Sequence, residues 1–195
     1  MNRKELALSI CIFGLVVIVV GAQDTDMGKS KDWVTYAERS GYKRTPPFKE
    51  TLEYSKRLAD SSDMIELVSV GKSREGRDIP LLIVSKNHAF TPSKAKKTGK
   101  PIIFIQAAIH AGESDGKDAG LALLRDIAIT KTQKHLLDDA ILLFIPIYNV
   151  DGHEMFGKYN RINQNGPEEM GFRANSAYQN LNRDYMKADN PETIA

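Results

Sequence analysis

Two apolar runs in the middle of the chain dominate its pattern of hydrophobic and polar positions. They cover residues 102–109, where Gln106 is the one polar residue, and 140–147, and nearly continuous runs of this kind are typical of strands buried on both faces, as in parallel sheets. Between them, leucine and isoleucine recur at helical spacing over residues 116–129, opposite a charged face. We therefore expect a helix capped at Ser114-Asp115, and the strand, helix and strand together form a βαβ unit.

A helix and a β-hairpin are predicted before this unit. Thr45 and Pro46 provide an N-cap and a first-turn proline, and apolar residues follow at approximately helical spacing, which predicts a helix over 46–60. Residues 65–70 and 79–84 are predicted strands joined by a polar turn that glycines bound. The whole pattern predicts an α/β fold in which helices flank a mixed, mainly parallel sheet.

The N-terminus has the features of a secretory signal peptide over residues 1–22. Arg3 and Lys4 precede an apolar run over 6–20, and small residues follow at a cleavage position. An uncleaved membrane anchor is the alternative, but a run of about fifteen residues is short for a span of about 20. We therefore expect a secreted or periplasmic protein, with no membrane partner after cleavage and a flexible polar segment over 23–44.

Composition narrows the chemistry of the remaining domain, residues 45–195. Over all 195 residues, Lys plus Arg is 27 and Asp plus Glu is 25, a net charge of +2, so nothing favours nucleic acid or an anionic membrane as the main partner. The basic segment 86–100 is expected to be a solvated connector. Cys11 is the only cysteine and lies in the predicted signal peptide. Histidines, carboxylates and arginines must therefore carry the chemistry.

His110 and Glu113 are the candidates for a metal site. They follow the first buried strand, at the carboxyl edge where ligands bind in open α/β sheets. An imidazole and a carboxylate three residues apart suit zinc, but the pair alone is equally compatible with a loop histidine beside a capping glutamate. A catalytic zinc site needs three protein ligands. His153, after the second strand, is the only geometric candidate for the third, although the turn at Asp151-Gly152 leaves its direction open.

Two arginines near the C-terminus are candidates for anion recognition. Arg173 follows Phe172, and Arg183 follows Asn182. A guanidinium binds a carboxylate through two hydrogen bonds and can polarise a carbonyl. On composition alone, two ordinary surface arginines remain the alternative.

Five separated motifs, in order over about residues 46–190, resemble those of carboxypeptidase A-like zinc metallocarboxypeptidases. In this sequence they are Gly71-Lys72-Ser73-Arg74-Glu75-Gly76-Arg77, similar to G-x-S-x-E-G-R; His110-Ala111-Gly112-Glu113, similar to H-x-x-E; Asn149-Val150-Asp151-Gly152, similar to N-P-D-G; Phe172-Arg173; and Asn182-Arg183. The resemblance implies a zinc carboxypeptidase-like domain with Zn²⁺ as its cofactor.

The resemblance also implies a role for each site residue. His110 and Glu113 are the implied first two zinc ligands, and Arg173 is the implied group that stabilises the carbonyl oxygen of the scissile bond as it becomes an oxyanion. Asn182 and Arg183 are implied to hold the terminal carboxylate of the substrate. The implied partner is a peptide with a free C-terminal carboxylate, from which zinc-activated water removes the last residue.

Three departures from the family pattern qualify this expectation. Gly112 stands where digestive members carry arginine, and Asn180 stands where many members carry the aspartate that orients the zinc-bound histidine. The third ligand and the general base of the family come later than any residue present here. We therefore expect residues 45–195 to be the N-terminal portion of an incomplete domain that alone is inactive, binds zinc poorly and exposes a sheet edge.

Two other functions are compatible with the same residues. A zinc amidohydrolase, deacylase or cell-wall peptide hydrolase on the same scaffold would use the same metal ligands. A non-catalytic module that keeps the carboxylate-binding arginines without competent zinc is the second. The substrate and the residues downstream of the asparagine–arginine pair distinguish them.

Overall fold

The computed structural model describes residues 31–195. The predicted signal peptide lies outside these residues. The chain divides into two units, Met1–Val34 and Thr35–Ala195, and the fold described below is that of the second. In the described part of the chain, no helix has the length and apolar character needed to cross a membrane.

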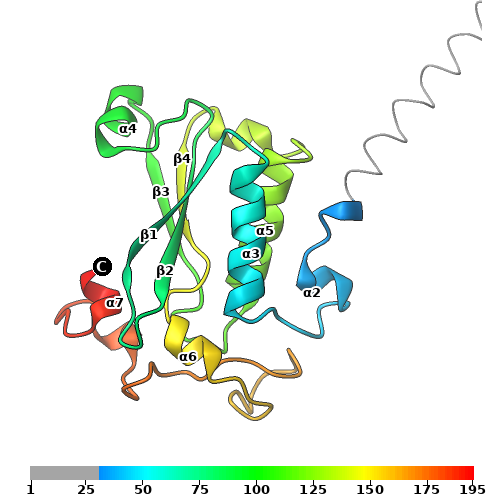
Figure 1. The fold of residues 1–195 in the computed structure, drawn as a ribbon, viewed down its shortest axis with the longest axis vertical. Helices are drawn as coiled ribbons and strands as arrows, with labels where there is room; N and C mark the ends of the chain where they lie inside the picture. Colours follow the sequence, from blue (N-terminus) through cyan, green and yellow to red (C-terminus); the bar gives the residue numbers. More distant parts are fainter. Residues whose placement is uncertain (1–30) are drawn as a thin grey trace, which may run out of the picture. The chain divides into compact units, whose positions relative to one another are not determined.

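A four-stranded mixed sheet forms the centre of this unit (Figure 1). The strands lie in the order β1 (Ile65–Lys72), β2 (Asp78–Val84), β4 (Ile141–Ile145) and β3 (Ile102–Gln106). The pairs β1–β2 and β2–β4 are antiparallel, and β3–β4 is parallel. The predicted hairpin and the predicted βαβ unit are both confirmed, as is a mixed sheet flanked by helices. The sheet of the described residues is not mainly parallel, however, because the hairpin contributes β1 and β2 and both of their pairings are antiparallel.

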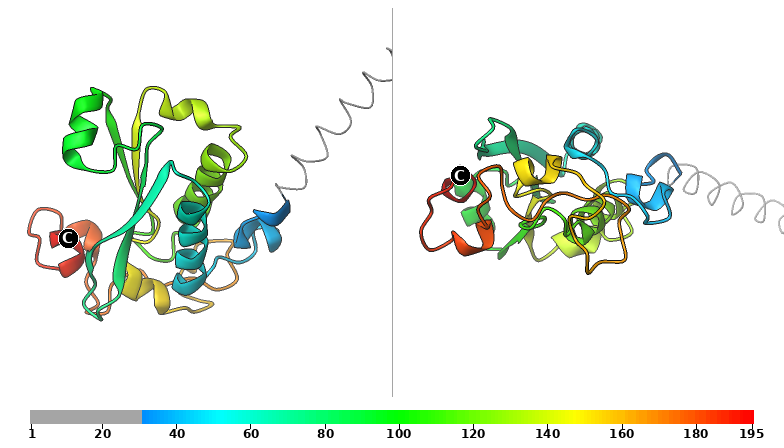
Figure 2. Two further views of the ribbon diagram at one scale, coloured as in Figure 1. Left: turned by 45° about the horizontal axis from the view of Figure 1, so that its top comes forward. Right: turned by 90° about the horizontal axis from the view of Figure 1, so that it is seen from below.

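Two long helices, α3 (Phe48–Asp60) and α5 (Asp115–Ala128), lie side by side against one face of the sheet (Figures 1 and 2). Leu58 and Leu124 are buried beneath them together with Phe144 of β4. Gly120 makes the close approach of α5 possible, because a Cβ atom there would lie 2.2 Å from the Phe144 ring. The predicted helix over 116–129 is therefore confirmed within one residue at each end.

Short helices complete the unit around these elements. They are α2 (Tyr36–Arg39), α4 (Pro92–Thr98), the 3₁₀ helix η1 (Lys134–Leu137), α6 (Val150–Glu154), the 3₁₀ helix η2 (Leu181–Arg183) and α7 (Pro191–Ile194). The last of these begins after Asn190 with a proline in its first turn.

The prediction that both central strands are buried on both faces is wrong for β3. Among the described residues, β3 has β4 as its only neighbour, and Ile102 and Phe104 are 51% and 53% exposed. Strand β4, which has a neighbour on each side, is buried over most of its length. The two apolar runs look alike, but their burial depends on sheet position, which hydropathy does not encode. The exposed edge itself agrees with the expectation of an open sheet.

Two local expectations also need correction. Helix α3 begins at Phe48 rather than in the turn of Pro46, because the Thr45 hydroxyl donates to Asp118 on α5 (2.8 Å) instead of capping α3. The basic connector is not a loop throughout, since it contains α4. Thr91 caps that helix by accepting from the Lys94 N–H, and Gly99 ends it at a φ of 67°.

Candidate metal and carboxylate site

His110 and Glu113 lie together in the turn that follows β3. The chain leaves the strand through Ala108, whose φ of 51° lies in the left-handed region, and the Glu113 N–H then donates to the His110 carbonyl (2.8 Å). This turn places both side chains on one side. His110 Nδ1 is 3.2 Å from Glu113 Oε1. Two ligands of a tetrahedral zinc ion, each about 2.1 Å from the metal, lie about 3.4 Å apart, so the pair fits a shared ion.

Asn180 fixes which nitrogen of His110 faces the carboxylate. Its Oδ1 lies 3.0 Å from His110 Nε2, and an amide oxygen only accepts, so Nε2 donates. When the ring is neutral, Nδ1 then presents its lone pair to Glu113 Oε1, and a cation between the two atoms would be bound by both. Asn180, at the position where the sequence departs from the family pattern, thus contacts the ring nitrogen through which an orienting residue would act.

Two arginines reach the same carboxylate oxygen. Arg161 Nη1 lies 2.6 Å and Arg173 Nη1 lies 3.8 Å from Glu113 Oε1. Burial alone raises the pKa of Glu113, but the hydrogen bond and the positive charge of Arg161 act against it, and the pKa is lowered. Glu113 is therefore ionised and ready to bind a cation at neutral pH. The sequence predicts Arg173 in this place and gives no indication of Arg161.

The asparagine–arginine pair is tied to this centre through Asn180. Asn180 Oδ1, which accepts from His110, also accepts from the Asn182 N–H at 3.0 Å. Asn182 and Arg183 lie in η2 and are exposed. The Arg183 guanidinium donates to the Asn182 carbonyl and has no ion pair with a carboxylate in residues 31–195. A substrate carboxylate could therefore pair with it without displacing an internal partner.

The Asp151 side chain connects two of the sequence motifs through buried hydrogen bonds and an ion pair. Its carboxylate is fully buried and pairs with Arg77 (2.7 Å). It also accepts hydrogen bonds from the Ser73 hydroxyl, the Glu75 N–H and the Ser176 hydroxyl. Burial alone raises the pKa of Asp151, but these donors outweigh it and lower the pKa. The glycine-rich turn before β2 and the Asn149–Gly152 turn are thus structural partners.

His153 is not a third ligand in this part of the chain. It is fully buried on α6, with Nε2 3.0 Å from Lys117 Nζ and Nδ1 3.2 Å from Glu154 Oε1, so both ring nitrogens are engaged. Burial, assisted by the Lys117 charge, lowers the pKa of His153 to about 4. Across residues 31–195, no three His, Cys, Asp or Glu side chains gather in a way that could hold a metal.

Lys117 is a second residue that sequence reasoning missed. Its side chain is fully buried and donates to the Pro46 carbonyl (2.6 Å) as well as to His153. Burial lowers the pKa of Lys117 to about 8. The signal was present in the sequence, because this lysine stands one helical turn before Leu121 on the apolar face of α5.

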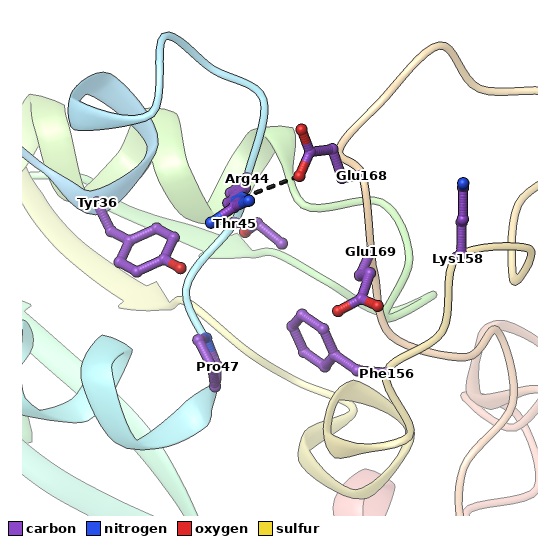
Figure 3. Close-up of a pocket in the computed structure, with 8 residues that line it drawn as sticks. All are labelled: Tyr36, Arg44, Thr45, Pro47, Phe156, Lys158, Glu168 and Glu169. Atoms are coloured by element: carbon purple, nitrogen blue, oxygen red, sulfur yellow. Dashed lines mark hydrogen bonds and ion pairs between the residues drawn. The ribbon is translucent and has the colours of Figure 1, made fainter.

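A separate cavity of about 590 Å³ lies outside the His110–Glu113 pair (Figure 3). Tyr36 and Phe156 contribute aromatic rings to its lining, and Arg44 pairs there with Glu168 (2.9 Å). None of the predicted site residues lines it. The candidate site therefore consists of the turn after β3 and the arginines around it, and this cavity is not part of it.

Comparison with known proteins identifies the family of the chain. The profile of the zinc carboxypeptidase family matches residues 51–193. Carboxypeptidase 2 of Trichophyton rubrum is 31% identical over 121 residues, which are 60% of this chain and 22% of that protein. The zinc carboxypeptidase of Saccharothrix mutabilis subsp. capreolus is 31% identical over 120 residues, which are 59% of this chain and 26% of that protein.

A solved structure gives the same fold. The metallo-carboxypeptidase from Burkholderia cenocepacia superposes with a TM-score of 0.55 at 22% identity, over 76% of this chain and 36% of that one. The chain thus spans about a quarter of the length of the curated relatives named above. The family profile covers well over half of this chain, and the chain therefore belongs to the zinc carboxypeptidase family.

Proposed function

We propose that this chain contributes the zinc-binding and carboxylate-binding residues of a secreted zinc metallocarboxypeptidase, which removes C-terminal residues from peptides. One observation carries the proposal. His110 Nδ1 and Glu113 Oε1 lie 3.2 Å apart, and Arg173 lies 3.8 Å from the same carboxylate oxygen. A divalent cation held by the imidazole and the carboxylate, with a cationic donor beside it, would supply the elements of electrostatic catalysis at a carbonyl.

The residues of this chain divide the work. Zinc held by His110 and Glu113 would supply Lewis-acid polarisation of the carbonyl and activation of water. Arg173 is half exposed and close to Glu113, so it donates to the carbonyl oxygen of the substrate as negative charge develops there. Asn180 holds the His110 ring in the tautomer that leaves Nδ1 free for the metal.

Arg183 makes the activity that of an exopeptidase. A terminal carboxylate offers two oxygens to the guanidinium, whereas an internal peptide bond brings no charge to this position. Asn182, beside it in η2, adds an amide donor for the same group. Substrates with a blocked C-terminus are therefore expected to bind much more weakly than those with a free one.

The same geometry sets a limit on these 195 residues. Two ligands are present, and catalytic zinc sites use three. We propose that the 195-residue chain by itself binds zinc weakly and does not hydrolyse peptides, and that the third ligand and the general base lie outside it. Export rests on the signal-peptide features of residues 1–22.

The test uses protein expressed from the complete gene. Peptides with free and with amidated C-termini, and N-acyl amino acids, are incubated with and without a chelator, and the products are identified by mass spectrometry. We expect loss of the last residue from free peptides alone, abolished by chelation and by His110→Ala. Release from N-acyl amino acids in preference to peptides would replace the proposal with a deacylase.

Two further measurements separate the roles. Arg183→Met is expected to raise KM for free peptides and to remove the preference over amidated ones, while Arg44→Met, outside the site, leaves both unchanged. Zinc-dependent hydrolysis by the 195-residue chain alone would contradict the proposed division of the site.

A further inference from the structure

Arg161 contacts Glu113, one of the two candidate metal ligands, although it is distant from both ligands in sequence. Its side chain is 14% exposed, and its guanidinium donates to Glu113 Oε1 at 2.6 Å. This is the shorter of the two arginine contacts to that carboxylate, since Arg173 Nη1 is 3.8 Å away. A largely buried guanidinium paired with a half-exposed carboxylate indicates that the arginine, rather than the glutamate, is the fixed partner.

Gly112 provides the space in which Arg161 lies. A Cβ atom at Gly112 would be 2.6 Å from Arg161 Cγ and 3.3 Å from its Cδ. The aliphatic part of the arginine therefore lies directly on the backbone of the zinc motif. Any side chain at position 112 and the arginine at position 161 exclude each other in this arrangement.

Gln164 fastens the same loop to the motif. Its amide Nε2 donates to the Gly112 carbonyl at 3.1 Å, and its backbone N–H donates to the Arg161 carbonyl at 3.2 Å. The turn from Arg161 to Gln164 is thus bound to the residue next to Glu113 by a hydrogen bond and by packing. Gln164 therefore holds the backbone of Arg161 near the motif, and Glu113 binds its guanidinium.

Glu113 needs such a partner because its own surroundings do not fix it. Its side chain is 46% exposed, so without a contact the carboxylate would sample orientations that point away from His110. Metal binding would then cost the ordering of that side chain. A carboxylate oxygen has two lone pairs, so Oε1 can accept from Arg161 and still bind a metal.

We propose that Arg161 is a positioning residue that holds Glu113 facing His110 before the metal binds. The proposal rests on the assignment of His110 and Glu113 as metal ligands. Hydrogen bonds to ligating carboxylates typically change metal affinity by about 10- to 100-fold. Gly112 brings no side chain of its own to the motif, and Arg161 reaches Glu113 from a different loop.

The test measures zinc affinity by competition with a chromophoric chelator, on the folded fraction established by circular dichroism. The proteins are the wild type, Arg161→Met, Arg161→Lys, His110→Ala and a matched control, Arg44→Met. Arg44 also pairs with a carboxylate, Glu168, but lies outside the site. We expect Arg161→Met to bind zinc about 10- to 100-fold more weakly and Arg161→Lys to recover part of the loss. Arg44→Met is expected to equal the wild type.

The outcomes separate the two proposals. Zinc affinity of Arg161→Met equal to or higher than that of the wild type, with His110→Ala still weak, overturns the positioning role and leaves the metal site standing. Equal affinity of the wild type and His110→Ala overturns both. If Arg161→Met does not fold, Arg161→Lys decides: a zinc affinity equal to that of the wild type, instead of the expected partial loss, contradicts the proposal.

Discussion

Strands β3 and β4 have nearly the same composition and opposite surroundings. The sequence of β3 is Ile-Ile-Phe-Ile-Gln, and that of β4 is Ile-Leu-Leu-Phe-Ile. Ile103 and Leu142 are partners in the parallel register, yet they are 46% and 6% exposed. The difference is one of position, because among the described residues β4 is central and β3 lies at the edge.

The contrast continues into the segments that follow the two strands. After β4 come Asp151 and His153, both fully buried and hydrogen-bonded to several partners. After β3 come His110 and Glu113, the latter half exposed. Both segments carry a histidine and a carboxylate, and both histidines are buried, but the Asp151 side chain is fully buried whereas that of Glu113 is half exposed. Residue type alone does not separate a scaffold from a site; the exposure of the carboxylate does.

The largest expected effect comes from the phenylalanines of the two strands. Phe144→Ala in β4 is expected to lower the free energy of unfolding by about 3–5 kcal/mol, because the ring is 2% exposed and fills the space above Gly120. Phe104→Ala in β3, where the ring is 53% exposed, is expected to lower it by less than about 1 kcal/mol. Urea unfolding measures both. Equal losses would show that β3 is covered in solution.

The two carboxylates give the next largest difference. Asp151→Asn keeps the volume but removes the buried charge that Arg77 faces, and it is expected to cost about 3 kcal/mol. Glu113→Gln, in a half-exposed place, is expected to change the free energy of unfolding by less than about 1 kcal/mol while abolishing zinc binding. Urea unfolding and zinc titration check the pair. A large loss of stability in Glu113→Gln would make that carboxylate part of the scaffold.

The same comparison shows how much of the fold the sequence predicts. Periodicity predicts α5 within one residue and places β1, β2 and β4, because these elements are half or fully buried and their pattern reflects it. It fails for the burial of β3, since an apolar run has the same hydropathy at an edge as in the centre. It also misses α4, although Thr91, Pro92 and Gly99 are ordinary start and stop signals, because the lysines between them suggest a solvated connector.

The site was predictable only as far as local spacing reaches. His110 and Glu113 are three residues apart, so one turn brings them together and the motif predicts the pair. Arg161 lies 48 residues after Glu113, and its approach depends on how the loop after α6 returns across Gly112. The glycine signals that something comes close, but not what. The place of Lys117 on the apolar face of α5 signals that this lysine is buried, but its pairing with His153 depends on tertiary packing that the sequence does not reveal.

Acid is expected to weaken the buried region through His153. Burial lowers the pKa of this histidine in the folded protein to about 4, from a reference value of 6.5. Between pH 6.5 and 4 the unfolded chain therefore binds a proton that the folded chain does not, and stability falls as the pH falls. The expected slope is about 1 kcal/mol per pH unit, and it is absent above pH 6.5. Urea unfolding at several pH values measures it. His153→Gln should flatten the curve between pH 6.5 and 5; an unchanged slope would assign the effect to another group.

The smallest expected effect on stability is a lysine at the edge strand. Ile103→Lys is expected to change the free energy of unfolding by less than about 0.5 kcal/mol, because the side chain is 46% exposed. A charge on an unpaired edge opposes pairing with another chain, so self-association is expected to decrease. Light scattering and urea unfolding test both statements. Leu142→Lys, at the partnered position in β4, is the matched control and is expected to prevent folding, since its side chain has no route to solvent between two strands and α5. If Ile103→Lys lowered the free energy of unfolding as much as Leu142→Lys does, β3 could not be an exposed edge strand in solution. The distinction between the edge strand and the central strand would then be wrong.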